Sequence, residues 1–394
     1  MRGVKKVIFG TLIFLALAIG LIYLFNFEYI FKGIQSTYLQ GHLTAHIDDH
    51  EFFDNRKIEA GKPQPWPQHK EYNQFSLTKE LQEKNEEAGT IAFLIIRNDS
   101  IWYENYAEEY GPHSLTNSFS VAKSLVAALL GKAIFDGHIE SLDQPVADFF
   151  PKFDKRLQLR HLVSMSSGLN WKEDYYNPFS MTVRAYLDEN IREMVLDLKV
   201  VEEPGKEFEY LSGNTQLLAM VLEKATGKNV SEYMSESFWK PMGMENYALW
   251  QLDSEESGME KAFCCIASNA RDFARFGKLY NHYGTWNGEQ LLDSAYVAES
   301  IKPQFEEYPH YGFGIWLENY EGQEVFYFRG ILGQYVIVLP QKDVIIVRLG
   351  QEGGKVPDDK EHPNDFYFYL EEVLNTLEAH DQENRTPQSA VPRH

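Results

Sequence analysis

The sequence predicts an α+β fold, in which one antiparallel sheet built from both halves of the chain is flanked by helices and carries an inserted helical lobe. Strand-like runs lie near 91–106 and again within 312–349, whereas residues from about 115 to 300 have mostly helix and loop patterns. The chain has 394 residues, 44% of them hydrophobic, which suffices for a large core. It contains no internal repeat and no heptad pattern.

Composition narrows the classes of function. The chain has 37 Lys and Arg against 58 Asp and Glu, a formal net charge of -21. This charge repels phosphate backbones and argues against nucleic-acid binding, although it also serves ordinary solubility. Two cysteines are too few for a disulfide framework or a four-thiolate zinc site.

The amino terminus predicts a membrane anchor over residues 1–28. Arg2, Lys5 and Lys6 precede an uncharged apolar run over 7–25, and about 20 helical residues cross a bilayer core. The run ends in bulky aromatic residues rather than a small-x-small cleavage site, so we expect an uncleaved anchor contacting the lipid bilayer. The preceding positive charges place the remaining chain outside the cytoplasm, in a periplasmic or extracellular position. The alternative is a cleaved signal peptide.

Residues 29–75 are expected to form a stalk or linker. Residues 62–67 are Pro-rich and favour extended backbone. His42, His46 and His50 recur every four residues beside acidic side chains, so a metal site on one helix face is one hypothesis. A solvated linker is the other, and it is favoured because no apolar stripe would hold such a helix in place.

The main folded domain is predicted over 76–380. Its first strands, 91–96 and 101–106, are joined by turn residues and predict a hairpin. A helix is expected over 365–379, and 381–394 is expected to be a flexible tail. Four further strands are predicted near the carboxyl end, over 312–318, 324–329, 334–339 and 344–349.

A Ser-x-x-Lys pattern occurs three times, at 76–79, 120–123 and 237–240. This spacing puts both side chains on one helix face, where the lysine can take the hydroxyl proton only if it is itself unprotonated. Burial favours the unprotonated amine, so a Ser-x-x-Lys pair that acts in catalysis should lie in apolar sequence. Only Ser120 and Lys123 do so, within the apolar run 119–131. The structural alternative is a lysine that extends to solvent or pairs with an acid.

Tyr210 is a second candidate for proton transfer, indicated by its local sequence. It lies where the turn at 204–206 leads through a short extended piece into a helix. A hydroxyl at such a corner can relay protons between serine and lysine. The alternative is a core tyrosine whose hydroxyl is hydrogen-bonded.

Six motifs in order resemble the serine β-lactamase and penicillin-binding-protein superfamily over roughly residues 85–375. In detail they are similar to its class C β-lactamase-related branch, closest in pattern to 6-aminohexanoate-oligomer hydrolases and related esterases. The motifs are Phe119-Ser120-Val121-Ala122-Lys123-Ser124, Leu142-Asp143-Gln144-Pro145-Val146, the segment 161–169 ending in Ser167-Gly168-Leu169, Tyr210-Leu211-Ser212, the helix 270–277, and Phe328-Arg329-Gly330.

The resemblance implies a β-lactamase/transpeptidase-like fold and an active site between sheet and helical lobe. It implies Ser120 as nucleophile, Lys123 and Tyr210 as the proton-handling pair, and the N–H groups of Ser120 and Ile331 as the oxyanion hole. It implies no metal and no organic cofactor.

Two departures from the family pattern bear on the substrate. Ser212 replaces the usual asparagine, and Phe328-Arg329 replaces a Lys-Thr pair, so true β-lactamase activity is not expected. The resemblance assigns substrate contacts to Ser212, Tyr175, Arg329 and Gly330, with Tyr175 on the scissile amide.

Cys264 and Cys265 are adjacent. A disulfide between neighbouring residues is possible outside the cytoplasm but strained, so two buried thiols are favoured over it.

The leading hypothesis is a membrane-anchored serine hydrolase that cleaves a small-molecule amide, ester or peptide through an acyl-enzyme. The alternative is a non-catalytic cell-envelope peptide-binding or sensor protein that uses the same site. The sequence does not specify an oligomeric state.

Overall fold

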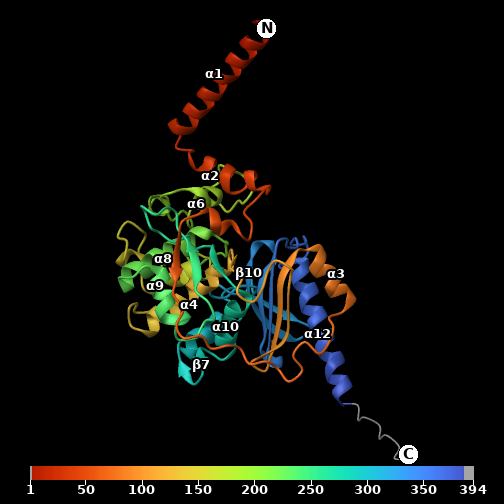
Figure 1. Ribbon diagram of the computed structural model, residues 1–394. Coiled ribbons are helices and arrows are strands. Elements are labelled where there is room, and N and C mark those ends of the chain that lie inside the picture. Colours follow the sequence, from red (N-terminus) through yellow and green to blue (C-terminus); the bar gives the residue numbers. More distant parts are fainter. Residues whose placement is uncertain (1, 386–394) are drawn as a thin grey trace, which may run out of the picture.

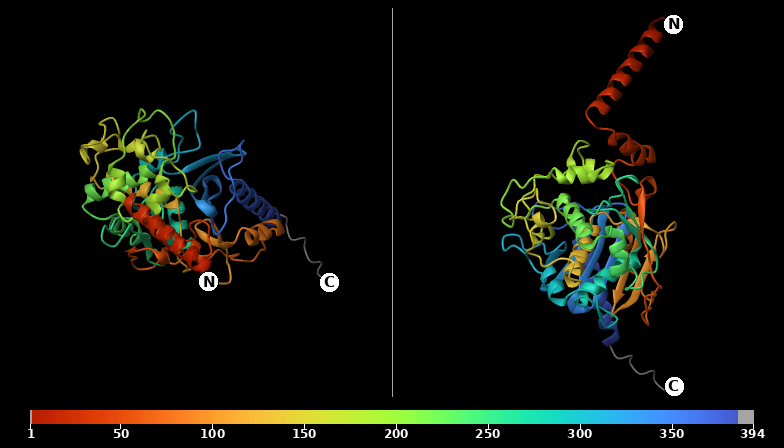
Figure 2. Two further views of the ribbon diagram at one scale, coloured as in Figure 1. Left: turned by 90° about the horizontal axis from the view of Figure 1, so that it is seen from above. Right: turned by 90° about the vertical axis from the view of Figure 1, so that its left-hand side faces the viewer.

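The computed structural model describes residues 2–385 (Figure 1). Helix α1 (Arg2–Leu24) stands away from a compact body, and its side chains between Val4 and Phe25 are mostly exposed. Helix α2 (Tyr29–Ser36) follows at once and lies against the body beside α6 (Met181–Leu187). Figure 2 shows that α1 and the end of the described chain point away from opposite ends of the body.

The larger sheet is antiparallel throughout and draws strands from both halves of the chain, as predicted. The hairpin turn is formed by Asn98 and Asp99, both with positive φ (49° and 57°), the backbone that suits a two-residue hairpin. The strand order is β3 (Ser100–Tyr106), β2 (Thr90–Arg97), β12 (Val344–Gly350), β11 (Gln334–Leu339), β10 (Gln323–Gly330) and β9 (Trp316–Tyr320).

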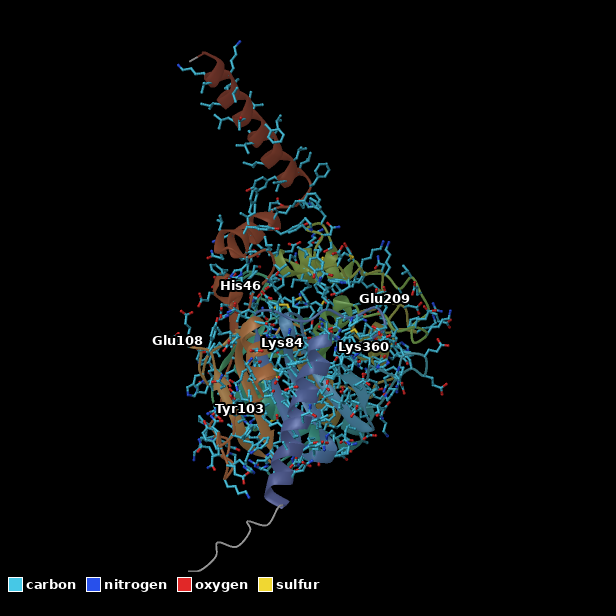
Figure 3. All side chains as sticks on the ribbon, turned by 90° about the vertical axis from the view of Figure 1, so that its right-hand side faces the viewer. His46, Lys84, Tyr103, Glu108, Glu209 and Lys360 are labelled. Carbon is cyan, nitrogen blue, oxygen red and sulfur yellow. A yellow bond between two sulfur atoms is a disulfide. The ribbon has the colours of Figure 1, made fainter. Side chains whose placement is uncertain are left out.

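Helices cover both faces of this sheet. Helix α12 (Asn364–Arg385) packs on the outer face with α3 (Lys79–Glu87) beside it (Figure 3). Helix α10 (Ala270–Asn281) packs on the inner face, where Gly277 would bring an added Cβ within 3.1 Å of Val336 and Ile345. The inner core is continuous with the helical lobe.

The helical lobe is built around α4 (Val121–Phe135), which is buried on nearly all sides. Because apolar residues occupy all faces of this helix rather than one stripe, its sequence explains why it is buried on nearly all sides. The other lobe elements are α5 (Leu159–Val163), α7 (Ile191–Leu196), α8 (Ser212–Thr226), α9 (Val230–Met234), α11 (Ser294–Ser300), η3 (Val146–Asp148) and η4 (Ser235–Trp239).

The lobe also holds a second sheet that the sequence did not predict, in the order β1 (Asn55–Ile58), β5 (Ala248–Gln251), β6 (Ile266–Ser268) and β4 (Thr116–Asn117). Its strands are two to four residues long, too short to show an alternating pattern. The remaining short elements are the pair β7 (Thr285–Trp286) and β8 (Glu289–Gln290), with η1 (Tyr38–Gln40), η2 (Asp49–Phe52), η5 (Ile331–Gly333) and η6 (Pro340–Lys342).

The prediction of a solvated linker over 29–75 is wrong. Strand β1 pairs with β5, and Tyr29, Phe53, Ile58 and Trp66 are buried. His46 is buried next to α2 (Figure 3). The segment's apolar side chains are spaced irregularly because they insert one by one into the lobe.

The histidine hypothesis for the same segment also fails in its geometry. The rings of His42 and His46 stack at 4.0 Å between centroids, and His46 Nε2 lies 3.2 Å from Ser36 O. The chain from His42 to His50 is not an α-helix, so the three side chains do not share one face.

The predicted flexible tail begins too early. Helix α12 continues to Arg385, and Asp381 pairs with Arg97 at 2.6 Å. His380 packs against Trp102, with ring centroids 4.9 Å apart. The rest of the predicted tail, 386–394, lies outside the described residues, as does Met1.

Candidate active site

The predicted nucleophile lies in a tight turn between β4 and α4. Ser120 directly precedes α4 and is half-buried. Phe119 has φ 47°, a left-handed conformation that bulky residues rarely adopt. Two hydrogen bonds hold this turn in place: Phe119 N–H donates to Asn117 Oδ1 at 2.9 Å, and Ser118 N–H donates to Ile266 O at 2.9 Å. Such over-determined strain is typical of functional positions.

Lys123 meets the geometric requirement set out from the sequence. Its Nζ lies 2.9 Å from Ser120 Oγ and donates to Phe263 O at 2.8 Å. The residue is 3% exposed. The first alternative, a lysine that extends to solvent, is therefore excluded. Nor is an acid its partner, since no carboxylate of the described residues forms an ion pair with Lys123.

The other Ser-x-x-Lys copies lack this arrangement. The Lys79 side chain is 82% exposed and pairs with Glu83 at 2.8 Å. Lys240 is exposed where its helix ends. Apolar context in the sequence therefore identifies the one copy of the three whose lysine is buried.

Strand β10 ends directly against the nucleophile turn. A Cβ on Gly330 would lie 2.3 Å from Ser118 O and 3.2 Å from Phe119 Cβ, so only glycine allows this approach. Gly330 itself is buried. Its contribution to the site is this close approach, which brings the next residue, Ile331, beside the turn. We find no acceptor for the N–H of Ser120 or of Ile331 among residues 2–385.

Two polar side chains hold the loop 331–333 in place, and neither of these side chains was singled out from the sequence. Buried Arg348 donates through Nη1 to Leu332 O at 2.7 Å and to Gly333 O at 2.9 Å. Gln334 Nε2 donates to Ile331 O at 3.3 Å and to Gly350 O at 2.7 Å. Both partners come from the sheet, so the position of the Ile331 amide is set by the rigid part of the fold.

Tyr210 lies over the buried amine. Lys123 Nζ is 5.0 Å from the centroid of its ring. The ring packs against Trp316 (5.5 Å) and Tyr311 (6.0 Å between centroids). Phe208 and Tyr308 extend this aromatic wall, stacked at 4.3 Å.

Arg329 belongs to the same wall. Its guanidinium lies 3.6 Å from the centroid of the Trp316 ring. Its charge acts on Tyr175 and on Tyr311, where it opposes the increase in pKa that burial causes in both phenols. Arg329 Nη1 is buried without a hydrogen-bond partner among the described residues. The predicted cation therefore lies in this wall, within electrostatic range of Tyr327 and Tyr210.

Ser212 has a different environment from the one predicted. It is 1% exposed, and its Oγ donates to Glu173 Oε1 at 2.6 Å. Its N–H donates to Glu173 Oε2 at 2.7 Å. Since the hydroxyl is already engaged, Ser212 fixes the first turn of α8 rather than offering a free donor.

Glu173 is a third site residue, besides Arg348 and Gln334, that the sequence did not single out. It accepts from Ser212 and from Trp171 Nε1, the latter at 2.8 Å, and it lies beside the hydroxyl of Tyr175. Burial raises the pKa of Tyr175 well above its ordinary value, and the Glu173 carboxylate raises it further. Tyr175 as a whole is 37% exposed, so part of this residue is open to solvent. An acid in a loop carries no sequence signal for such a role.

The cysteine prediction is wrong. Cys264 and Cys265 form a disulfide, and both residues are buried. The bond is accommodated by a positive φ of 77° at Cys265. It lies directly after Phe263, whose carbonyl contacts Lys123.

Two groups of side chains in the described residues come close enough to hold a metal ion: His310, Glu318 and His362, and Asp99, His282 and Asp343. Both are engaged within the protein. His362 contacts Tyr327 OH at 2.8 Å and Leu317 O at 3.0 Å through its two nitrogens. Asp99 pairs with Lys278 at 3.1 Å and with His282 at 3.1 Å.

A family model described as beta-lactamase matches residues 77–366. The chain belongs to the β-lactamase family. It is therefore a serine hydrolase with a β-lactamase/transpeptidase-like fold. The family assignment favours the enzyme over the non-catalytic binding protein.

Among curated relatives, the 6-aminohexanoate-dimer hydrolase of Paenarthrobacter ureafaciens is 27% identical over 236 residues, covering 56% of this chain and 59% of that protein. A D-aminopeptidase of Brucella anthropi is 32% identical over 139 residues, covering 33% of this chain and 25% of the relative. The matched part thus spans less than two thirds of either relative.

The solved structure of a putative 6-aminohexanoate-dimer hydrolase from Bacillus anthracis has the same fold. Its TM-score is 0.72 at 23% identity, covering 87% of this chain and 94% of that one. The covered part exceeds the residues matched by the family model, so the likeness extends beyond the hydrolase core.

Proposed function

We propose that this chain is a membrane-anchored, extracytoplasmic hydrolase that cleaves an amide or ester through an acyl-enzyme on Ser120. The observation that carries the proposal is the 2.9 Å approach of buried Lys123 Nζ to Ser120 Oγ. An amine in this position can accept the hydroxyl proton as Oγ attacks a carbonyl carbon.

The steps follow from the arrangement around Ser120. The carbonyl oxygen that becomes negative is stabilised by the N–H groups of Ser120 and Ile331. As the tetrahedral intermediate collapses, Lys123 or Tyr210 returns a proton to the leaving amine or alcohol. Water then attacks the acyl-ester, and the released Ser120 oxygen regains its proton. The Ser120, Lys123 and Tyr210 set is supported by its proximity in one site.

The favoured substrate is an amide or ester with a carboxylate, of the 6-aminohexanoate-dimer type, rather than a β-lactam. Arg329, with one nitrogen unpartnered, supports carboxylate binding, and the aromatic wall suits the alkyl chain of such a substrate. The names of the curated relatives point to amide bonds as well. Tyr175 is proposed to contact the scissile amide.

Labelling with a fluorophosphonate probe tests the nucleophile. The wild type should be modified on Ser120, and Ser120→Ala should lose both labelling and turnover. Ser76→Ala is the matched control, since it alters a Ser-x-x-Lys copy with an exposed lysine and should leave both unchanged. Full turnover by Ser120→Ala would refute the proposal. A substrate panel of p-nitrophenyl esters, 6-aminohexanoate dimer and nitrocefin then tests the substrate class.

The anchor is proposed on α1. The helix from Val4 to Leu24 is long and apolar enough to cross a membrane, a property that anchors and signal sequences share. Exposed apolar side chains continue past α1 at Phe31, Ile34, Tyr38 and Leu39, which supports a body held close to a lipid surface.

Carbonate extraction followed by mass spectrometry of the amino terminus tests the anchor. An intact protein should stay in the membrane fraction. A soluble product lacking α1 would identify the helix as a cleaved signal.

A further inference from the structure

Asp49 is a buried carboxylate in a segment that precedes the residues matched by the family model. It is 1% exposed. Its Oδ1 accepts from Asn117 Nδ2 and from Gln251 Nε2, each at 2.9 Å. Its Oδ2 accepts from Tyr186 OH and from His46 N–H. Four donors from four parts of the chain therefore meet on one side chain.

One of these donors leads directly to the nucleophile turn. Asn117 donates through Nδ2 to Asp49, and its Oδ1 accepts from Phe119 N–H at 2.9 Å. The backbone N–H of Asn117 also donates to Ile47 O at 2.7 Å. The segment around Asp49 thus contacts both the backbone and the side chain of the strand that ends two residues before Phe119.

The chemistry of an amide explains what Asp49 contributes. An asparagine side chain can present either its oxygen or its NH₂ group to a neighbour. Because the oxygen of Asp49 accepts hydrogen bonds, it selects the rotamer in which Nδ2 faces it. The oxygen of Asn117 must then face Phe119 N–H. In the opposite orientation the NH₂ group would face Phe119 N–H, and two donors would point at each other. The first orientation stabilises the left-handed backbone at Phe119, adjacent to Ser120.

The segment that carries Asp49 is docked firmly enough to act in this way. Strand β1 continues the sheet whose other edge is β4, the strand that holds Asn117. Tyr29 OH donates to Pro178 O at 3.0 Å, and the ring of Phe53 lies over the buried Nζ of Lys261, 3.7 Å from its centroid. Removing the segment would expose this amine and leave the donors of Asn117, Tyr186 and Gln251 without their acceptor.

We propose that Asp49 is a positioning residue for the hydrolase reaction, acting through Asn117 and Phe119 on the orientation of Ser120. The inference rests on the proposed role of Ser120 as nucleophile. It makes residues 46–58 part of the catalytic unit rather than a spacer between anchor and enzyme.

The test compares acylation rates in the full-length protein in detergent micelles. Asp49→Ala should reduce the rate of fluorophosphonate labelling and of the p-nitrophenyl acetate burst by about 10²-fold, since small misplacements of reacting groups have effects of this size. KM should change little, because Asp49 does not touch the substrate site. Asp49→Asn keeps an acceptor oxygen toward Asn117 and should restore most of the rate.

A double-mutant cycle shows whether Asp49 acts through Asn117. Asn117→Ala should lose activity to a similar extent, and the double variant should lose no more than Asn117→Ala alone. Tyr29→Phe is the matched control, because it weakens docking of the same segment without touching this chain of hydrogen bonds. It should label at the wild-type rate.

The outcomes separate the two claims. If the wild type does not react with either probe, the proposed function fails. If the wild type reacts and a folded Asp49→Ala variant reacts equally fast, or if the two single effects add fully, the positioning role is overturned. If Asp49→Ala does not fold, a folded Asn117→Ala variant with wild-type rates overturns it instead. Circular dichroism and thermal unfolding of each variant establish folding.

Discussion

Gly330→Ala should impair the chemical step with a limited effect on the rest of the fold. The added Cβ would lie 2.3 Å from Ser118 O, whereas real Cβ contacts are essentially never under 3.0 Å. The end of β10 and the nucleophile turn must therefore separate by about 0.7 Å. A hydrogen bond of about 2.9 Å from Ile331 N–H to the oxyanion would lengthen to about 3.6 Å, beyond useful range.

The expected kinetic loss follows from that separation. Removal of one oxyanion-hole donor typically lowers kcat by about 10²–10³-fold. We expect a loss of this size in the p-nitrophenyl acetate burst, with labelling still directed to Ser120. The loop 331–333 remains fixed by Arg348, so the displacement should not spread through the sheet.

Gly111→Ala is the control for this experiment, because an added Cβ there meets nothing within 4 Å. It should acylate at the wild-type rate. The two variants should be compared at equal fractions folded, measured by thermal unfolding. A folded Gly330→Ala variant with an undiminished burst would refute both the role of the Ile331 amide and the contact argument.

Four further outcomes are expected. Tyr210→Phe should slow acylation by about 10²–10⁴-fold without loss of fold, as judged by burst kinetics and circular dichroism; an unchanged burst would remove it from proton transfer. Arg329→Gln should raise KM for 6-aminohexanoate dimer by about 10–100-fold, the range for hydrogen bonds to charged groups, but not KM for p-nitrophenyl acetate; equal effects on both would argue against carboxylate binding. Burial, with the nearby charges of Arg329 and His310, lowers the pKa of His362 from 6.5 to about 3. The unfolded state therefore binds more protons than the folded state between these two values. The contribution of neutral, buried His362 to the free energy of unfolding is thus complete above pH 6.5 and is lost as the pH falls toward 3. In urea denaturation between pH 3 and 6.5, His362→Gln should reduce the dependence of the free energy of unfolding on pH, and an unchanged dependence would contradict the assignment. Alkylation of the denatured protein without reductant should leave Cys264 and Cys265 unmodified, and two added groups before reduction would show free thiols.

The strands of the main sheet were predictable because each is five to eight residues long and rich in buried apolar side chains. Strand β11 was predicted with its exact bounds. Strand β9 starts at Trp316 rather than 312, because the backbone at Gly314 has φ 69° and packs against α4, with an added Cβ 2.7 Å from Ala127. The pattern of hydrophobicity extends across this bend, so the sequence alone could not place it.

The site residues also fall into those that local sequence predicts and those that it does not. Ser120 and Lys123 are three residues apart on one helix, so local spacing was sufficient to pair them. Glu173, Arg348 and Gln334 act through contacts with residues far away in sequence. No local pattern distinguishes an acid that accepts from the first turn of α8 from any other acid in a loop. Ser212 shows the converse, since the family motif predicts a substrate contact for a hydroxyl that donates to Glu173 in the structure.

Asp49 and Asn117 are 68 residues apart, and the sequence predicts a linker around the first and mostly helix and loop around the second. Their contact changes how the chain divides into functional parts. If the amide of Asn117 holds Phe119 in its left-handed conformation, the nucleophile depends on a segment that precedes the family-matched residues 77–366. A domain cut at residue 77 would keep Ser120, Lys123 and Tyr210 but lose the acceptor that orients Asn117. The catalytic unit is then defined by hydrogen bonds across the lobe, and it begins before the motifs that identify the family.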